Sequence, residues 1–432
     1  MRRMSAHEEP VFETVVMKFG GSSVADAEKV KNVARRLAAA KDQGLRVVGT
    51  VSAMGKTTDG LIALANEVSD APDPREMDML LSTGERVSCA LCAMAINDLG
   101  HRAISLTGSQ AGIVTDTSHT KARILDVRAD RIMDALDEDA IVLVAGFQGV
   151  STSKDVTTLG RGGSDTTAVA LAAAVGAEVC EIYTDVSGVF SADPRIVPDA
   201  RKLDVVSFEE MLEMSASGAG VLQLRSVEYA RNHGVRIHCR SSFDDGPGTV
   251  VVSEQETMEH PLITAVTHST GEARVTLMGV PDTPGAAGRI ATALADANVN
   301  VDMIIQNEPI TEGSRADMSF TVPRDDVRAA RAALEPLQAE IGIGEVATDE
   351  SMGKVSIIGA GMKTHPGVAA KVFTVLGDHG INIEMISTSP IKISCVIPGD
   401  RVPDAVRALH AAFALSGDDT IRPEQPFGQF AS

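Results

Sequence analysis

Hydrophobic positions along residues 15–255 form short apolar runs separated by longer amphipathic stretches. TVVMKFGG has the pattern of a strand that ends in a glycine-rich turn, and AEKVKNVARRLAAAKDQG that of an amphipathic helix closed by Gly44. RVVGTVSAMG, RAISLTG, AIVLVAGFQGV, EVCEIYTDVSGVF and VRIHCRSS predict further strands. MDMLLSTGERVSCALCAMAINDLG predicts one long helix that ends at Gly100, and SDTTAVALAAAVGA an alanine-rich helix. Strands that alternate with helices favour βαβ units and a mostly parallel sheet.

The pattern changes after residue 240. SSFDDGPGTVV and VSEQETMEHP are rich in proline, glycine and acids, which is typical of a linker. ARVTLMGVPDTPGAAGRIATALADANVNVDMIIQN then aligns with GKVSIIGAGMKTHPGVAAKVFTVLGDHGINIEMIST, about 80 residues further on. Each copy predicts a strand, a Pro-Gly turn, a helix and a second strand, so two small α+β modules are expected. Two copies of a ligand-sized module indicate regulation rather than a second catalytic site.

Composition sets the broad class. With 432 residues the chain is too long for one hydrophobic core, and 44% hydrophobic with 23% charged residues is ordinary for a globular protein. Tryptophan is absent and aromatic residues are 3%, so small aliphatic residues must build the core, as suits helices packed on a parallel sheet. The net charge of −20 argues against a nucleic-acid partner, which needs a basic face.

Cysteine usage and the termini predict a cytoplasmic protein with no membrane partner. Cys89 and Cys92 form a C-x-x-C, but the run around them is apolar and helical and no second Cys/His pair is closely spaced. We therefore interpret both as core residues and expect no metal site. The N-terminus MRRMSAHEEP has no apolar stretch typical of a signal peptide, and no run is expected to span a membrane.

Two glycine-rich loops carry the candidate chemistry. KFGGSS, at 18–23, follows an apolar strand, and Gly20 and Gly21 let the backbone approach a bound group beside the charge of Lys18. It matches neither the P-loop nor the Rossmann pattern, and alone it could be an ordinary turn.

TTLGRGGSDTTA, at 157–168, adds a second backbone cradle. Arg161 offers a planar fork for a carboxylate or phosphate. Ser164 and Asp165 are expected to cap a helix that begins near Thr166. Two such loops on one parallel sheet predict a site at the carboxyl ends of its strands.

The motifs together resemble one family. KFGGSSVAD, VSAMGKTTD, LLSTGER, SLTGSQAG, AGFQG, TTLGRGGSDTTA, YTDVSGVFSADPR and LRSVEYA occur in the order found in aspartate kinases of the amino-acid kinase family. The resemblance covers roughly residues 13–415, and the repeat is similar to that family's paired ACT domains. It implies a three-layer α/β kinase domain with a mostly parallel sheet, followed by two α+β, ferredoxin-like ACT modules.

The resemblance implies domain limits and an activity. The catalytic domain would span 13–252, the linker 253–264, the ACT modules 265–345 and 346–418, and a tail 419–432. The reaction would convert ATP and L-aspartate to ADP and 4-phospho-L-aspartate, the entry to lysine, threonine and methionine synthesis. A carboxylate needs no general base, so alignment and charge neutralisation would carry the transfer.

Site residues follow motif by motif. The catalytic pair would be Lys18 and Asp165. ATP would be bound by Lys18, Gly20, Gly21, Ser52, Thr184, Asp185, Phe190, Asp193, Pro194 and Arg195. Aspartate would be bound by Ser52, Thr57, Glu85, Arg161, Gly162, Gly163 and Ser164, with Glu85 on the α-ammonium and Arg161 on the α-carboxylate. Mg²⁺ would be held mainly by ATP oxygens and water.

The resemblance also implies an effector site and an oligomer. Threonine, alone or with lysine, would be bound as inhibitor by Asp282, Ala287, Asn300, Asp302, Gln306, Asn382 and Ile383. The ACT modules would pair between chains in a homo- or hetero-oligomer. Met258 resembles the internal start of a separate short subunit in some relatives, although an ordinary linker methionine fits equally well.

Three positions depart from the family pattern. Gly220 stands where a lysine is expected near the ATP phosphates, Ser187 replaces an acid in T-D-V-D-G, and Pro390 replaces a glutamate in S-T-S-E-I. Gly220 keeps open the alternative of a weakly active or non-catalytic amino-acid sensor. A related kinase of glutamate is a further alternative, against which Glu85 and the paired repeat argue.

Overall fold

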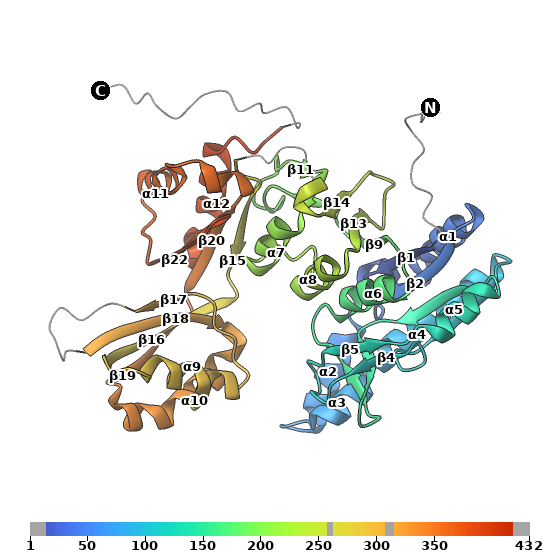
Figure 1. The fold of residues 1–432 in the computed structure, drawn as a ribbon, viewed down its shortest axis with the longest axis horizontal. Helices are drawn as coiled ribbons and strands as arrows, with labels where there is room; N and C mark the ends of the chain where they lie inside the picture. The colour runs from blue at the N-terminus through green and yellow to red at the C-terminus, as the bar shows by residue number, and fades with distance from the viewer. Residues whose placement is uncertain (1–13, 257–261, 307–314, 418–432) are drawn as a thin grey trace, which may run out of the picture. The chain divides into compact units, whose positions relative to one another are not determined.

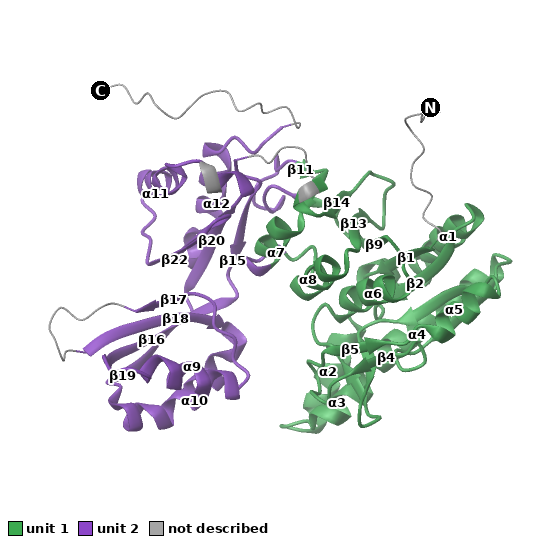
Figure 2. Cartoon of the chain, viewed as in Figure 1, with its two compact units in different colours: residues 1–189, 202–215, 220–258 green, residues 190–201, 216–219, 259–432 purple. Residues whose placement is uncertain are grey.

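The computed structural model describes residues 14–256, 262–306 and 315–417. Figure 2 shows two compact units. Unit 1 holds residues up to 189, 202–215 and 220–258, and unit 2 holds 190–201, 216–219 and the chain from 259. The unit 1 limits leave out the segment 190–201, although it lies inside the predicted catalytic domain.

Unit 1 is built on an eight-stranded sheet in the order β12-β14-β13-β9-β1-β2-β6-β3. Every neighbouring pair in it is parallel except β13 with β14, so the predicted mostly parallel sheet is confirmed. Its strands are β1 (Thr14–Phe19), β2 (Arg46–Val51), β3 (Ala103–Leu106), β6 (Ile141–Ala145), β9 (Val179–Thr184), β12 (Val205–Ser207), β13 (Arg236–Ser241) and β14 (Thr249–Val252).

Helices pack on both faces of this sheet (Figure 1). The helices of unit 1 are α1 (Ala27–Asp42), α2 (Thr57–Val68), α3 (Pro74–Leu81), α4 (Thr83–Asp98), α5 (Asp130–Asp137), α6 (Gly163–Ala174), α7 (Phe208–Ala216) and α8 (Leu224–His233). Alternation along β1 separates the faces, because Val15, Met17 and Phe19 pack in one core with α1 and α4, whereas Lys18 faces α6. This is the three-layer arrangement expected from the sequence.

A second, four-stranded sheet carries the loop between residues 158 and 163. Its order is β5-β4-β7-β8, with β4 (Ile113–Thr115), β5 (Ile124–Val127), β7 (Gln148–Ser151) and β8 (Val156–Thr158). The single strand predicted over 140–150 is therefore wrong. It is two strands in different sheets, turned at Gly146 and Phe147, where Phe147 has a φ of 67°.

The single helix predicted over 77–100 is also interrupted. α3 ends at Leu81 and α4 begins at Thr83. The Ser82 carbonyl between them accepts a hydrogen bond from Gln148 Nε2 at 2.8 Å. The stretch Pro74–Asp98 passes a length and hydropathy test for a membrane span, with 50% of its most apolar window buried in the fold. The core helix of a globular protein passes the same test.

Unit 2 contains the two expected α+β modules, each a four-stranded antiparallel sheet. The sheets run β17-β18-β16-β19 and β15-β20-β22-β21. The elements are β15 (Ala265–Ser269), β16 (Glu272–Pro281), α9 (Ala286–Asp296), β17 (Ile304–Gln306), β18 (Arg315–Pro323), α10 (Val327–Leu337), β19 (Glu345–Asp349), β20 (Met352–Ile358), α11 (Val368–Asp378), β21 (Met385–Ser389), β22 (Lys392–Pro398) and α12 (Val402–Ala412). The repeat strand–turn–helix–strand appears in both.

One strand and one segment belong to the second module although their place in the sequence does not suggest it. β15 lies inside the limits predicted for the first module, 265–345, but pairs with β20 of the second module, Val266 facing Ile357. The segment 190–201, between the short strands β10 (Val189–Phe190) and β11 (Lys202–Leu203), also belongs to unit 2. Ala192 and Val197 lie in the core of the second module, and Ser191 Oγ lies 2.9 Å from His410 Nε2.

Candidate active site

The predicted site lies at one edge of the main sheet of unit 1. The parallel registers align Phe19 with Val51 and with Tyr183, and Val51 with Ala145. The residues that follow these strands are therefore brought to one edge, at the carboxyl ends of β1, β2, β6 and β9. This is where an α/β sheet binds its ligands.

The first glycine loop is closed against the loop after β2. The Gly55 N–H donates to the Gly21 carbonyl at 3.0 Å. A Cβ on Gly21 would lie only 2.9 Å from the Ala53 carbonyl oxygen, so a side chain does not fit there. The requirement for glycine at position 21 thus comes from the close packing of the two loops, and the neighbouring Gly20 N–H donates to the Tyr183 carbonyl at 3.3 Å.

Lys18 and Asp165 form a buried ion pair across the sheet edge. Nζ of Lys18 lies 2.6 Å from Oδ1 of Asp165, and the two residues are 9% and 6% exposed. The expectation that Ser164 and Asp165 cap the helix is wrong. α6 begins at Gly163, its N-cap is Gly162 at a φ of 72°, and no side chain caps it. Asp165 instead turns to Lys18, because a full charge is the stronger partner.

Ser164 lies close to the end of β6. A Cβ on Gly146 would lie 2.7 Å from Ser164 Oγ, so Gly146 allows α6 to approach the sheet. Ser52 is fixed through its backbone. Its N–H donates to Phe19 O at 3.0 Å, and its carbonyl accepts from Ser88 Oγ at 2.6 Å. Thr57, at the start of α2, donates its hydroxyl to the Met54 carbonyl at 2.6 Å.

Glu85 is a buried carboxyl group with one oxygen unused. It lies in the first turn of α4, is 3% exposed, and its Oε1 accepts from the Ala53 N–H at 3.2 Å. Its Oε2 is buried and has no hydrogen-bond partner among the described residues. Burial raises the pKa of Glu85 to about 7. A buried oxygen of this kind is suited to a cationic ligand.

The second glycine loop carries Arg161 on the surface. Gly160 and Gly162 adopt φ values of 76° and 72°, which glycine allows without strain. Arg161 is exposed, so its guanidinium is accessible to a ligand. Arg225 anchors the loop, donating to the Leu159 carbonyl at 2.8 Å and the Ala122 carbonyl at 3.0 Å. The motif LRSVEYA contains Arg225, but sequence reasoning gave it no role.

The residues predicted for the nucleotide are divided between the units. Thr184 ends β9 and its Oγ1 lies 3.1 Å from Asp185 Oδ1 in unit 1. Phe190, Pro194 and the ion pair of Arg195 with Asp193, at 2.7 Å, belong to unit 2. The adenosine pocket therefore stays a prediction.

Gly220 has open surroundings. It is exposed, and a Cβ at this position would meet no atom within 4 Å. Its φ lies outside the left-handed region, so a lysine there meets no backbone strain. The loop that lacks the expected lysine can accept one.

The cysteines lie in the core. Cys89 and Cys92 are buried on α4, and burial raises the pKa of both thiols to about 12. Within residues 14–256, 262–306 and 315–417, no group of three or more His, Cys, Asp or Glu side chains is placed to hold a metal ion.

The predicted effector residues of the first module are exposed but not gathered together. Gln306 is level with Leu277, because both pair with Met318, and it lies toward the end of β16 where Asp282 follows. Asp302 is level with the start of β16, because its N–H donates to the Thr321 carbonyl opposite Arg274. One strand length, roughly 20 Å, therefore separates Asp282 from Asp302.

Asp302 already has a partner in the second module. Nζ of Lys354, a residue only 1% exposed on β20, lies 2.6 Å from Asp302 Oδ2 and 2.6 Å from Glu272 Oε1. The neighbouring charges raise the pKa of Lys354 against the opposing effect of burial. Arg274 adds ion pairs to Asp349 and Glu384. In the second module, Asn382 is exposed and Ile383 half-buried.

Comparison with known sequences identifies the parts. The profile of the amino acid kinase family matches residues 13–241, and two ACT domain profiles match 274–339 and 355–413. An aspartokinase of Mycolicibacterium smegmatis is 58% identical over 408 residues, 94% of this chain and 97% of that protein.

Solved structures give the same likeness. The structure of E. coli aspartokinase III in complex with aspartate and ADP has a TM-score of 0.80 at 26% identity, and the match covers 93% of this chain and 99% of that one. The same enzyme in complex with lysine and aspartate has a TM-score of 0.70 at 27% identity, over 93% and 99% of the two chains.

Proposed function

The chain belongs to the aspartokinases of the amino acid kinase family, and on that basis we propose that the residues at the strand ends of unit 1 transfer the γ-phosphoryl group of ATP to the side-chain carboxylate of L-aspartate. A carboxylate oxygen of aspartate forms a bond to the γ-phosphorus as the bond to the ADP oxygen breaks. The products are ADP and 4-phospho-L-aspartate.

Glu85 and Arg161 hold the two α-groups of aspartate. The unused Oε2 of Glu85 accepts hydrogen bonds from the α-ammonium, and this buried unpaired oxygen is the observation that carries the proposal. The exposed guanidinium of Arg161 takes the α-carboxylate as a bidentate pair. With both α-groups fixed, the side-chain carboxylate is presented to the phosphates, which supplies the alignment on which this transfer depends.

Lys18 stabilises the transferring group. Its ammonium lies at the end of β1 and is oriented by Asp165 at 2.6 Å. The loop of Gly20 and Gly21 and the N-terminus of α6 add backbone N–H groups, and such donors favour phosphate oxygens. Mg²⁺, held mainly by ATP oxygens and water, would neutralise charge on the phosphates.

The assay is ADP release measured with L-aspartate, D-aspartate and L-glutamate. Arg161→Lys keeps the charge but loses the fork, so the KM for aspartate should rise, roughly tenfold or more, while the KM for ATP changes by less than about twofold. Lys154→Arg, a change at another exposed cation of unit 1, is the control. A collapse of ATP affinity in Arg161→Lys would assign this residue to the nucleotide and contradict the proposal.

The proposal also covers the effector, the pairing of chains and the cellular location. Lysine in the structure of E. coli aspartokinase III supports an amino-acid effector for the ACT modules, with threonine as the first candidate and lysine as the second, since Pro390 replaces the glutamate of the family pattern. The chains pair through their ACT modules. Five buried free cysteines support a reducing, cytoplasmic location.

A further inference from the structure

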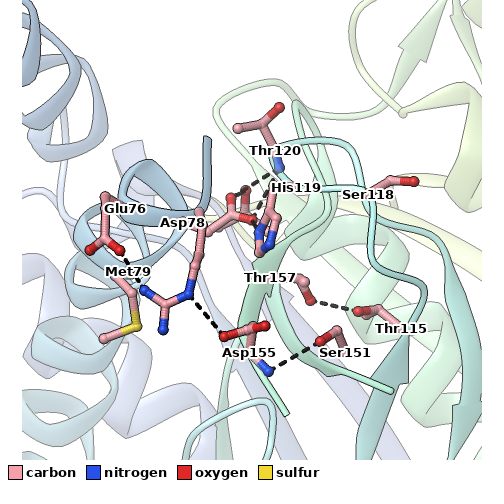
Figure 3. A network of polar contacts seen from close by, with 12 residues as sticks. Glu76, Asp78, Met79, Thr115, Ser118, His119, Thr120, Ser151, Asp155 and Thr157 are labelled. Atoms are coloured by element: carbon pink, nitrogen blue, oxygen red, sulfur yellow. Dashed lines mark hydrogen bonds and ion pairs between the residues drawn. The ribbon is translucent and has the colours of Figure 1, made fainter. Parts of the chain in front are cut away.

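Asp78 is a fully buried carboxylate that no step of the proposed reaction uses. It lies on α3 and is 0% exposed. Figure 3 shows its carboxylate beside His119 and Thr120, with dashed contacts to both. A carboxylate is rarely buried so completely unless several donors hold it.

Three residues of the small sheet β5-β4-β7-β8 and its β4–β5 loop contact the Asp78 carboxylate. His119 Nδ1 lies 2.7 Å from Asp78 Oδ2, and the Thr120 N–H lies 3.1 Å from both carboxylate oxygens. The hydroxyl of Thr158 donates to Oδ1. All three bonds join α3 to chain segments that are 41, 42 and 80 residues away in sequence.

These segments are the two supports of the loop that carries Arg161. Thr158 ends β8, and the glycine loop begins with the next residue. Thr120 has a φ of 64°, which is costly for a β-branched residue and needs tertiary support. Its carbonyl lies against Gly160, where a Cβ would be 3.0 Å away. Asp78 therefore holds the start of the loop and the turn against which it packs.

The same helix leads directly to Glu85. Only Ser82 separates α3 from α4, and Glu85 is in the first turn of α4. Gln148 ties this junction to β7 through the Ser82 carbonyl. Glu85 and Arg161 are thus carried by two different substructures, and Asp78 bonds one to the other.

We propose that Asp78 is a positioning residue for aspartate: it fixes the spacing between Glu85 and the loop of Arg161 to that of the ammonium and carboxylate of one α-amino acid. The inference rests on the function proposed above. Asp78 does not touch the substrate, and it acts through the loop. The carboxylate bonds to His119, Thr120 and Thr158 and makes no hydrogen bond to Lys18 or the first glycine loop among the described residues.

Asp78→Asn tests the proposal with little change in shape. An amide accepts through one oxygen only, so its NH₂ group must face the Thr120 N–H together with either the Thr158 O–H or His119 Nδ1. The loop should shift, and a small misplacement of this kind is costly in a transfer reaction. We expect the KM for aspartate to rise roughly tenfold, with the KM for ATP within about twofold of wild type.

A second pair of variants keeps the test valid if Asp78→Asn fails to fold. Thr158→Val removes one donor with no loss of volume, and Thr158→Ser keeps it. Thr158→Val should raise the KM for aspartate severalfold, and Thr158→Ser should leave it near the wild-type value. This rescue by the conservative change is not expected if position 158 only fills space.

Thr115→Val is the matched control. It removes another buried hydrogen bond of the same small sheet, that of Thr115 with Thr157 at 2.6 Å (Figure 3), but does not touch the Arg161 loop. If Thr115→Val lowers the melting temperature about as much as Thr158→Val but leaves the KM for aspartate unchanged, the proposal is supported. An equal rise in KM for Thr115→Val, or a folded Asp78→Asn with wild-type kinetics, overturns it. Arg161→Lys separates the two claims: if that variant leaves the KM for aspartate unaltered, the proposed function fails as well.

Discussion

Glu85→Gln should remove a pH-dependent step in aspartate binding. The carboxyl is 3% exposed, and burial raises its pKa to about 7. Below this value the free enzyme holds Glu85 neutral, and a neutral carboxyl cannot pair with the α-ammonium of the substrate. Binding therefore requires the loss of one proton, and kcat/KM for aspartate should rise with pH until about 7 and then level off.

The magnitude follows from the pKa. A rise from 4.5 to about 7 corresponds to about 3 kcal/mol that disfavours the charged form in the empty site. Because the folded-state pKa lies above the unfolded value, the contribution of Glu85 to stability is present below about pH 4.5 and is lost as pH rises through 7. Glu85→Gln should therefore be more stable than wild type above pH 7, by up to about 3 kcal/mol, and equally stable near pH 4.5.

Kinetics between pH 5.5 and 8.5 test both parts. Wild-type kcat/KM for aspartate should fall nearly tenfold per pH unit below 7. On the plateau above pH 7, kcat/KM of Glu85→Gln should be roughly a hundredfold lower than that of wild type, because breaking a buried ion pair costs about 3 kcal/mol. The pH profile of this variant should lack the rise towards pH 7 that deprotonation of Glu85 causes in wild type. ATP and aspartate titrate in the same way with both enzymes. The ratio of wild-type to Glu85→Gln kcat/KM at each pH therefore reports the titration of Glu85 alone. A ratio that does not change with pH would refute the reasoning.

Four further predictions concern other parts of the molecule. Lys18→Ala should lower kcat roughly a hundredfold or more, and since it leaves Asp165 buried without its partner, adding Asp165→Asn should restore the melting temperature but not turnover. Gly220→Lys should raise kcat/KM for ATP roughly tenfold, because the position is open and its backbone unstrained; no gain would mean that another cation already acts there. Gln306→Ala should weaken threonine inhibition roughly five- to a hundredfold at unchanged basal kcat, and calorimetry that detects neither threonine nor lysine binding would contradict the effector site. Asp302→Ala is a poor test of that site, since it also strips a partner from buried Lys354 and should lower the melting temperature.

Local patterns predicted the frame of the site. The strand and glycine turn around Lys18 follow from an apolar run, two glycines and a helix pattern, and the structure has all three. Glu85 and Arg161 were found through motifs. The environment of Glu85 was not predicted from the sequence, because burial of its Oε2 depends on how closely α4 packs under the loop after β2.

The errors come from contacts between distant residues. Capping preferences favour Ser164 or Asp165 at a helix start, but the charge of Lys18, 147 residues earlier in the sequence, diverts Asp165. At the break between α3 and α4, the Ser82 carbonyl accepts from Gln148, 66 residues later in the sequence. Asp78 in an amphipathic helix has the pattern of a solvated residue, and nothing near it in sequence indicates that His119 and Thr158 will enclose it. Single-sequence patterns report neighbours along the chain and not partners across it.

The path of segment 190–201 has a consequence for recombination between related genes. A crossover in the linker at 253–264 would join a foreign regulatory half to a native Ser191, Ala192 and Val197, although these three residues belong to the fold of that half. His410, 1% exposed, would face a serine selected in another background. A chain that starts at Met258, which lies outside the described residues, would lack the segment altogether. The regulatory unit is therefore encoded by separate stretches of the gene. A chimera that exchanges 190–201 and 216–219 together with the C-terminal half should keep a higher melting temperature than one joined at the linker alone.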